Sequence, residues 1–237
     1  MSKFISILAA SLPLVISNSA QAFEFTGGSI DLNYSAFTED NDFATTALTG
    51  AVEFGFNRNF GVQFDLGTFA YDFVDESGTN AALHAIYHIN ETSSLGAFYG
   101  RDEIDGEGVD FYGVEIGQEF QDFGVEAYIG AGDDSGVSAT VFGLTGLYEF
   151  DQGFGLGASW ERMDFNGDLD LTRFAVKADF AVGSNVDLYA EFGSFSADGF
   201  GVSGSENFFG IGAKFNFGAS RGATFEDRGM LKLIPGL

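Results

Sequence analysis

The residues of this chain with the most chemical potential are two histidines and a large excess of acidic side chains, 35 against 10 lysines and arginines. His84 and His88 are four residues apart, a spacing that brings two metal ligands together on a helix. On a strand they share one face but lie roughly 13 Å apart at ~3.3 Å per residue, too far to share an ion. No serine stands in a nucleophile-elbow sequence, although a Ser-His-acid triad formed in space stays open. We therefore expect packed histidines, no enzyme, no metal site and no cofactor.

The composition excludes several other classes of protein. There is no cysteine, so neither a disulfide framework nor a thiolate metal site is possible. A formal charge of −25 repels nucleic acid, whose binding depends on neutralising phosphates with basic side chains. Acidic chains with few aromatics tend to be disordered, but 29 Phe, 8 Tyr and one Trp argue for a folded chain.

The first 22 residues have the pattern of a secretory signal peptide. Lys3 precedes an apolar core from Phe4 to Ile16, and Ala20-Gln21-Ala22 is a small-residue cleavage site. No later stretch approaches the roughly 20 apolar residues that a transmembrane helix needs. We expect residues 1–22 to be a signal peptide and residues 23–218 to form one folded unit.

The remaining pattern is a series of alternating strands. About twelve are expected, at 24–37, 44–56, 60–73, 80–89, 94–102, 109–120, 123–131, 138–150, 154–163, 169–182, 186–195 and 206–218. The links alternate between short ones, such as Gln121-Asp122, and longer acidic ones, Val74–Thr79, Glu103–Gly108, Gly132–Val137, Asp164–Asp168 and Ser196–Gly204. Compact turns at one end and roomier loops at the other are typical of an all-β, transmembrane, antiparallel up-and-down barrel in a bacterial outer membrane. The N-terminus would then lie in the periplasm.

Each strand has one apolar and one polar face, because side chains alternate across a strand. A water-soluble barrel would turn the apolar face inward. Here, however, phenylalanines on the apolar parity lie beside the short turns and would form an aromatic girdle at a membrane interface. These are Phe56, Phe60, Phe120, Phe123, Phe150, Phe154, Phe180 and Phe217.

The polar face would then line the pore. It carries Asp31, Glu53, Asp65, His84, His88, Glu115, Glu119, Glu126, Glu149, Glu161, Arg173, Lys177, Asp179, Asp187, Glu191 and Lys214. Unpaired buried charges are costly, so this many ionisable groups implies water inside. Twelve strands lie between the filled interior of eight and the aqueous channel of sixteen, which indicates a narrow pore. Arg173 and Lys177 either form a basic strip facing an acidic wall or satisfy neighbouring carboxylates.

Residues 219–237 follow the last expected strand and are more basic than the barrel. They include Arg221, Arg228 and Lys232. Folding into the acidic lumen and docking on a periplasmic partner are both open. A disordered end is the usual state of a terminus, so we take these residues as a C-terminal periplasmic tail.

The closing strand, Phe208–Phe217, contains Gly-x-Lys-Phe-x-Phe. Together with the signal and the hairpins it resembles Gram-negative outer-membrane porins, especially the acidic porins of alphaproteobacteria. The resemblance implies an outer-membrane location and contacts with lipid and with the barrel-assembly machinery. It does not extend to trimers, because this chain has fewer strands and no long pore loop, so the oligomeric state stays open.

The sequence thus predicts a passive channel for small hydrophilic solutes and ions with a preference for cations. The alternative is a closed structural or surface-interaction barrel without an open pore.

Overall fold

The computed structural model describes residues 24–40, 42–72, 76–134, 137–150, 152–166, 169–218 and 223–235. The expected signal peptide lies outside the described residues. The described helix is a single turn, η1 (Leu231–Leu233), so no helix in these ranges is long and apolar enough to cross a membrane.

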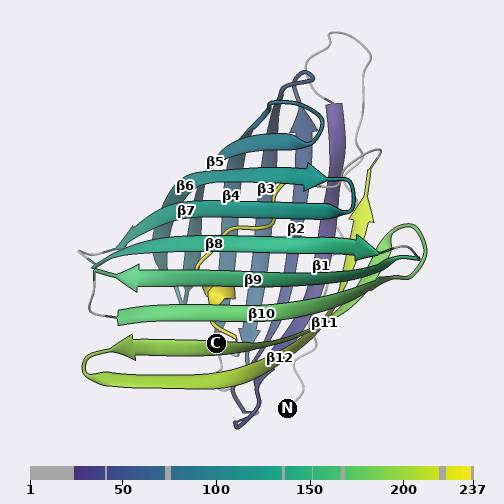
Figure 1. Ribbon diagram of the computed structural model, residues 1–237. Helices are drawn as coiled ribbons and strands as arrows, with labels where there is room; N and C mark the ends of the chain where they lie inside the picture. Colours follow the sequence, from purple (N-terminus) through teal and green to yellow (C-terminus); the bar gives the residue numbers. More distant parts are fainter. Residues whose placement is uncertain are drawn as a thin grey trace, which may run out of the picture.

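Twelve antiparallel strands form one closed barrel in which every strand pairs with its neighbours in sequence and β1 pairs with β12 (Figure 1). The strands are β1 (Glu24–Phe37), β2 (Ala44–Gly55), β3 (Phe60–Tyr71), β4 (Ser77–His88), β5 (Ser93–Ile104), β6 (Glu107–Phe120), β7 (Phe123–Asp134), β8 (Val137–Phe150), β9 (Phe154–Phe165), β10 (Leu169–Ala181), β11 (Val186–Gly199) and β12 (Val202–Phe217). Closure runs from the pair Gly28–Phe217 to the pair Phe37–Phe208. The predicted all-β up-and-down barrel of about twelve strands is confirmed.

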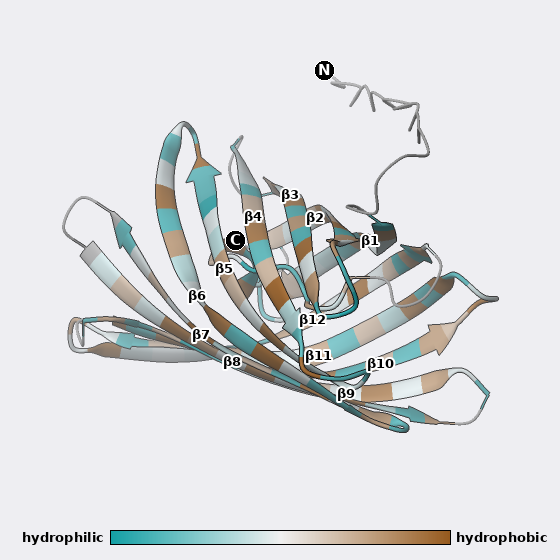
Figure 2. Ribbon diagram, turned by 90° about the horizontal axis from the view of Figure 1, so that it is seen from above, coloured by the Kyte–Doolittle hydropathy of each residue, from teal (hydrophilic) through white to brown (hydrophobic). Residues whose placement is uncertain are grey.

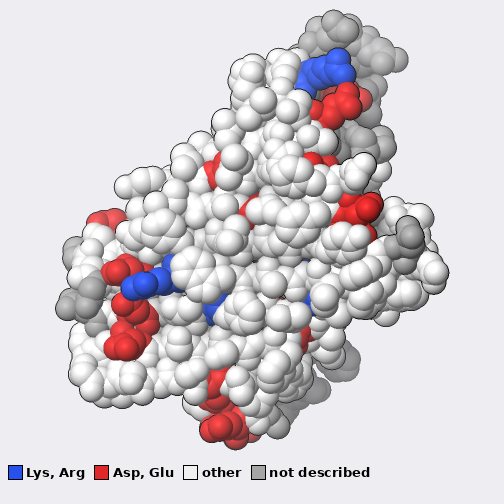
Figure 3. Space-filling model, viewed as in Figure 1, with Lys and Arg blue, Asp and Glu red and all other residues white. Residues whose placement is uncertain are grey.

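Side chains alternate between the two faces of the wall as the sequence predicts. In β3, Phe64 and Leu66 are 45% and 67% exposed on the outer face, whereas Asp65 between them is buried inside. Hydropathy accordingly changes in bands along the strands (Figure 2). Most of the outer surface over β5–β9 carries no charge, and the larger groups of charged side chains lie toward its edges (Figure 3). This is the surface that a lipid bilayer requires.

The predicted girdle residues lie on the outer face at the end of the barrel where β1 begins and β12 ends, here called the terminal end. Phe217 is half-buried and stacks on Phe25 and Phe215. The other seven are exposed: Phe56, Phe60, Phe120, Phe123, Phe150, Phe154 and Phe180. Their role at a membrane interface stays a prediction.

The predicted contrast between short and long links is wrong at four of the five links expected to be long, whereas residues 72–76 between β3 and β4 still form a longer link. At the opposite end of the barrel the links shrink to residues 105–106, 135–136, 166–168 and 200–201. The Asp105-Gly106 pair has φ values of 49° and 81°, the left-handed pair of a two-residue hairpin turn. Polar residues that resemble loop residues in the sequence therefore continue the strands up to these short turns.

The interior is not polar throughout, which the two-face interpretation did not anticipate. Toward the opposite end, inward side chains form apolar clusters that include Phe69 and Tyr71, Phe98 and Phe111, and Met163 and Leu171. The charged part of the inner face therefore lies nearer the middle and the terminal end.

The outer face gives a test of membrane insertion. We expect Leu66→Arg to lower the free energy of unfolding in lipid vesicles by about 2–4 kcal/mol, because it places a charge against the middle of the bilayer. Val202, 74% exposed at the opposite end, provides the control, and Val202→Arg should cost about 0–1 kcal/mol. Equal effects of the two substitutions in denaturant titrations would contradict a lipid-facing outer surface.

Candidate pore and the segment that crosses it

The strand register places all sixteen predicted pore residues on the inner face, but in separate environments. His88 and Glu119 lie near the terminal end, where Glu119 borders a second cavity of about 180 Å³. Five lie on the wall formed by β2–β7: Glu53, Asp65, His84, Glu115 and Glu126. Nine line one cavity on the other side: Asp31, Glu149, Glu161, Arg173, Lys177, Asp179, Asp187, Glu191 and Lys214.

Residues 223–235 lie inside the barrel and separate these two sides. In Figure 1 this segment, in yellow, passes behind β6–β8, and its residues Leu233 and Ile234 pack inside the barrel. Thr224 contacts Glu53 in the terminal half, and Leu233 packs with Met163 and Leu171 near the opposite end. The segment therefore crosses the lumen lengthwise. We call residues 223–235 the inner segment.

Side chains of the β2–β7 wall hold the main chain of the inner segment. Gln63, fully buried, donates to the carbonyl of Phe225 at 2.8 Å and accepts from its N–H at 3.1 Å. Asn80 donates to the carbonyl of Arg228 at 2.9 Å. Asp102 accepts from the N–H groups of Met230 and Leu231. These bonds satisfy main-chain groups that burial would otherwise leave unpaired.

Arg228 is the strongest electrostatic contact of the inner segment. Its guanidinium is 2% exposed, bonds Glu115 at 2.9 Å and Glu126, and stacks over the ring of Tyr128 at 4.3 Å. Burial lowers the pKa of Arg228, but Glu126 and Glu115 outweigh it and hold the pKa above its usual value. The arginine thus neutralises two carboxylates that have little access to water.

His84 lies under the same contact and is a packed histidine, as expected. It is fully buried between Asp65, 2.7 Å from Nε2, and Glu115, 2.6 Å from Nδ1. Its ring also stacks on Phe225 at 6.3 Å between centroids. No group of three or more metal-ligating side chains in the described ranges could hold a metal ion.

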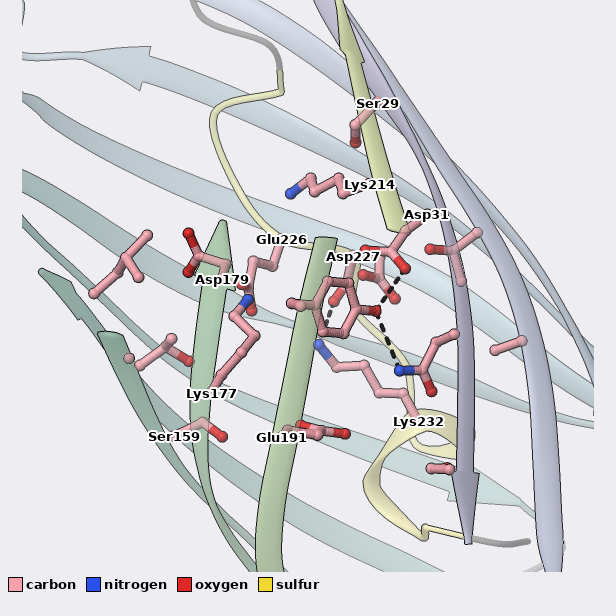
Figure 4. A pocket seen from close by; sticks show the side chains of 18 of the residues that line it. Ser29, Asp31, Ser159, Lys177, Asp179, Glu191, Lys214, Glu226, Asp227 and Lys232 are labelled. Atoms are coloured by element: carbon pink, nitrogen blue, oxygen red, sulfur yellow. Dashed lines mark hydrogen bonds between the residues drawn. The ribbon is translucent and has the colours of Figure 1, made fainter. Parts of the chain in front are cut away.

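The cavity on the other side has a volume of about 430 Å³. Its lining extends from Asn216, near the terminal end, to Thr45, near the opposite end. Lys177 from β10, Lys214 from β12 and Lys232 from the inner segment reach into it among several carboxylates (Figure 4). Lys177 also lies over the ring of Tyr189, whose hydroxyl donates to Asp31 at 2.7 Å. Basic and acidic side chains therefore face one another across this cavity.

The inner segment contributes both signs of charge to the cavity. Burial raises the pKa of Glu226, but nearby basic groups, chiefly Lys177 and Lys232, lower it to about 2. Burial lowers the pKa of Lys232, but Asp227 and Glu161 raise it above the usual value. Both groups are therefore charged at neutral pH, and the segment adds charges of both signs to the cavity lining beside its apolar residues Leu231, Ile234 and Pro235.

Several residues that build this arrangement were missed in the sequence. Gln63, Asn80 and Asp102 have the inward parity, and that signal could have found them. The roles of Arg228 and Lys232 could not be found that way, because their partners lie on strands more than seventy residues away. The basic character of the tail was the available indication.

Comparisons with known proteins agree with this architecture. A family model described as Gram-negative porin matches residues 15–200. A structure of the KdgM porin in complex with disordered oligogalacturonate is similar, with a TM-score of 0.60 and 14% identity over 80% of this chain and 99% of that chain. A NanC porin structure gives a TM-score of 0.59 and 11% identity over 79% and 98%. At these identities the structures show a shared fold. No curated protein matches the chain.

The arginine contact predicts a stability effect. We expect Arg228→Ala to lower the free energy of unfolding by about 3–5 kcal/mol, because it removes the shared cation of the buried Glu115 and the partly buried Glu126. Arg58→Ala, at an ion pair whose side chains are 85% and 84% exposed, is the control and should cost about 0–1 kcal/mol. Denaturant titration of both variants measures the difference, and equal values would contradict the assigned role.

The pKa of Glu226 predicts a pH effect. Because the folded pKa lies below the usual 4.5, ionised Glu226 stabilises the fold above that value, and this contribution is lost as the pH falls toward about 2. We expect Glu226→Gln to flatten the dependence of the unfolding temperature on pH in this range. Thermal unfolding at a series of pH values measures this dependence, and a Glu226→Gln variant with the same dependence as the parent protein would contradict the assigned contribution.

Proposed function

The chain belongs to the Gram-negative porin family, whose members are channels of the outer membrane, and we propose that it is a passive channel for small hydrophilic solutes and ions with a preference for cations. The observation that carries the proposal is the cavity beside the inner segment, which has lining residues from both halves of the barrel. The preference for cations follows from the charged side chains that line this cavity.

Carboxylates outnumber basic groups in this cavity by eight to four. The acids are Asp31, Glu149, Glu161, Asp179, Asp187, Glu191, Glu226 and Asp227, and the bases are Arg173, Lys177, Lys214 and Lys232. Arg173 forms salt bridges with Glu161 and Glu191, so its positive charge is largely neutralised. A confined aqueous path with this balance concentrates cations and repels anions.

The width of the barrel supports small solutes only. Twelve strands enclose an interior between the filled and the water-filled classes, and the inner segment takes part of it. We propose that the remaining path carries ions and small hydrophilic molecules. We further propose that the terminal end of the barrel faces the periplasm and that the closing strand is recognised by the barrel-assembly machinery. No catalytic role is proposed, since the buried His84 is bonded at both ring nitrogens.

One similar structure is of a porin in complex with an anionic oligosaccharide. Lys177 and Lys214 line this cavity and form no salt bridge with another described residue. Their ammonium groups are therefore available to contact an anionic solute. The excess of carboxylates favours cations over such solutes, and a selectivity measurement separates the two.

The alternative is a closed barrel with a structural or surface-interaction role. The observation that favours it is the inner segment, which fills one side of the lumen and packs against the apolar clusters near the opposite end. A closed barrel predicts equal swelling of sugar-loaded liposomes with and without the protein, whereas a channel predicts faster swelling with it.

Planar-bilayer recording of the purified protein tests the proposal. We expect discrete conductance steps and, under a salt gradient, a reversal potential of the sign that cation selectivity requires. An absence of conductance would favour the closed barrel, and a reversal potential of the opposite sign would contradict the cation preference.

The cavity carboxylates should set the selectivity. Asp179 borders the cavity, and one of its buried carboxylate oxygens has no hydrogen-bond partner among the described residues. We expect Asp179→Asn to shift the reversal potential toward zero, because it removes one negative charge from the path. Glu91→Gln, at an exposed turn outside the cavity, is the matched control and should leave the reversal potential as in the parent protein.

A further inference from the structure

The inner segment is held differently from any strand of the barrel. The ladder of main-chain hydrogen bonds closes from β1 to β12 without it. Within the described part of the chain, no hydrogen bond between two main-chain groups joins residues 223–235 to a strand. The segment is held by side chains of the wall instead, so it can leave without breaking the barrel.

We propose that the inner wall of β2–β7 is a binding groove for an extended peptide with one phenylalanine and one arginine anchor, and that the inner segment is its ligand held in cis. The groove lies inside the channel, so the effect on conductance rests on the proposed function. The binding itself does not depend on conduction.

Side chains of the wall form hydrogen bonds with the peptide main chain at successive positions. Glu53 accepts from the N–H of Thr224 at 2.8 Å, and Gln63 bonds both main-chain groups of Phe225. Asn80 and Asp102 then take the main chain near Arg228 and Met230, as described above. Contacts of this kind recognise an extended backbone, and the side-chain sites determine which peptide fits.

Glycines of the wall make room for the side chains of the segment. A Cβ at Gly96 would lie 2.7 Å from the ring of Phe225, and one at Gly117 would lie 3.3 Å from it. A Cβ at Gly78 would lie 2.7 Å from the side chain of Leu231. A Cβ at Gly132 would collide with the side chain of Met230. These glycines of the wall thus form seats for the side chains of the segment, and the seat for Phe225 leaves that side chain 2% exposed.

The arginine anchor makes the groove selective. In an empty groove Glu115 and Glu126 would face each other without a buried cation, with His84 as the only basic neighbour of Glu115 among the described residues. A ligand that brings a guanidinium to this point removes that cost. The chemistry therefore fits a peptide that presents Phe225 and Arg228 before a helical turn, with the further apolar residues Met230, Leu231 and Leu233, of which the last two lie in η1.

A thiol-labelling experiment tests the cis complex, since the chain contains no cysteine. Gly117→Cys places a thiol under Phe225, and Gly124→Cys places one on the adjacent strand of the same inner face, where a Cβ would meet nothing within 4 Å. In the folded protein we expect a water-soluble maleimide to label the Gly117→Cys variant at least about tenfold more slowly than the Gly124→Cys variant, the factor that 1.4 kcal/mol of binding gives. Similar rates would overturn the proposal.

The second stage tests exchange. In Gly117→Cys, the added substitutions Phe225→Ala and Arg228→Ala should raise the labelling rate to that of Gly124→Cys. A synthetic peptide with the sequence of residues 223–235 should then slow labelling again, and the same peptide with both anchors replaced by alanine should not. If the doubly weakened variant does not assemble, Phe225→Ala alone serves. Failure of the native peptide to protect the thiol at position 117 would overturn the groove.

Conductance measurements complete the test and distinguish a failure of the proposed groove from a failure of the proposed channel. The weakened variant should conduct at least about twofold more than the full-length parent, and the native peptide should reverse the increase. Protection of the thiol at position 117 without conductance in any variant would leave the groove intact and refute the channel. Conductance that is unaffected by the peptide, with that thiol unprotected, would refute the groove and leave the channel intact.

Discussion

Closure of the main-chain ladder is the constraint on which the rest of this structure depends. A chain in a bilayer has no water to satisfy its peptide groups, so each strand must pair on both sides. The ten pairs between β1 and β12 complete that requirement. Once the wall is closed, alternation along each strand sends one set of side chains to lipid and the other to the interior. The apolar outer surface and the charged interior are two results of one arrangement.

The interior then has to accommodate charges that lipid excludes. The two sides of the lumen do this in different ways. On the β2–β7 side, Asp65, Glu115 and Glu126 are bonded to His84 and Arg228, with little access to water. On the other side, Asp31, Asp179 and the lysines border a cavity large enough for water and solutes. The paired side supports the fold, and the cavity side provides the path through which transport is proposed.

Much of this could be predicted from the sequence, because period-two alternation is a local signal. That signal predicted the twelve strands and the inward parity of residues as far apart as Asp31 and Lys214. It failed at strand ends, where the Asp105-Gly106 turn was interpreted as part of a longer loop although its residue types suit a two-residue hairpin. It also failed for Phe98 and Phe111, which are apolar but point inward. A division of each strand into an apolar face toward lipid and a polar face toward water does not predict an apolar cluster inside the barrel.

The inner segment lay beyond such reasoning because its structure is decided by distant partners. Nothing in residues 223–235 has the period of a strand, and Arg228 meets Glu115 only after the barrel has brought β6 to the segment. Because the ladder closes without the segment, the barrel can form first and present a completed wall to it. The described charges of the segment balance, with Glu226 and Asp227 against Arg228 and Lys232. Its occupancy therefore changes the width of the path and the exposure of the wall carboxylates, while the sign of the cavity's field remains set by β1 and β8–β12.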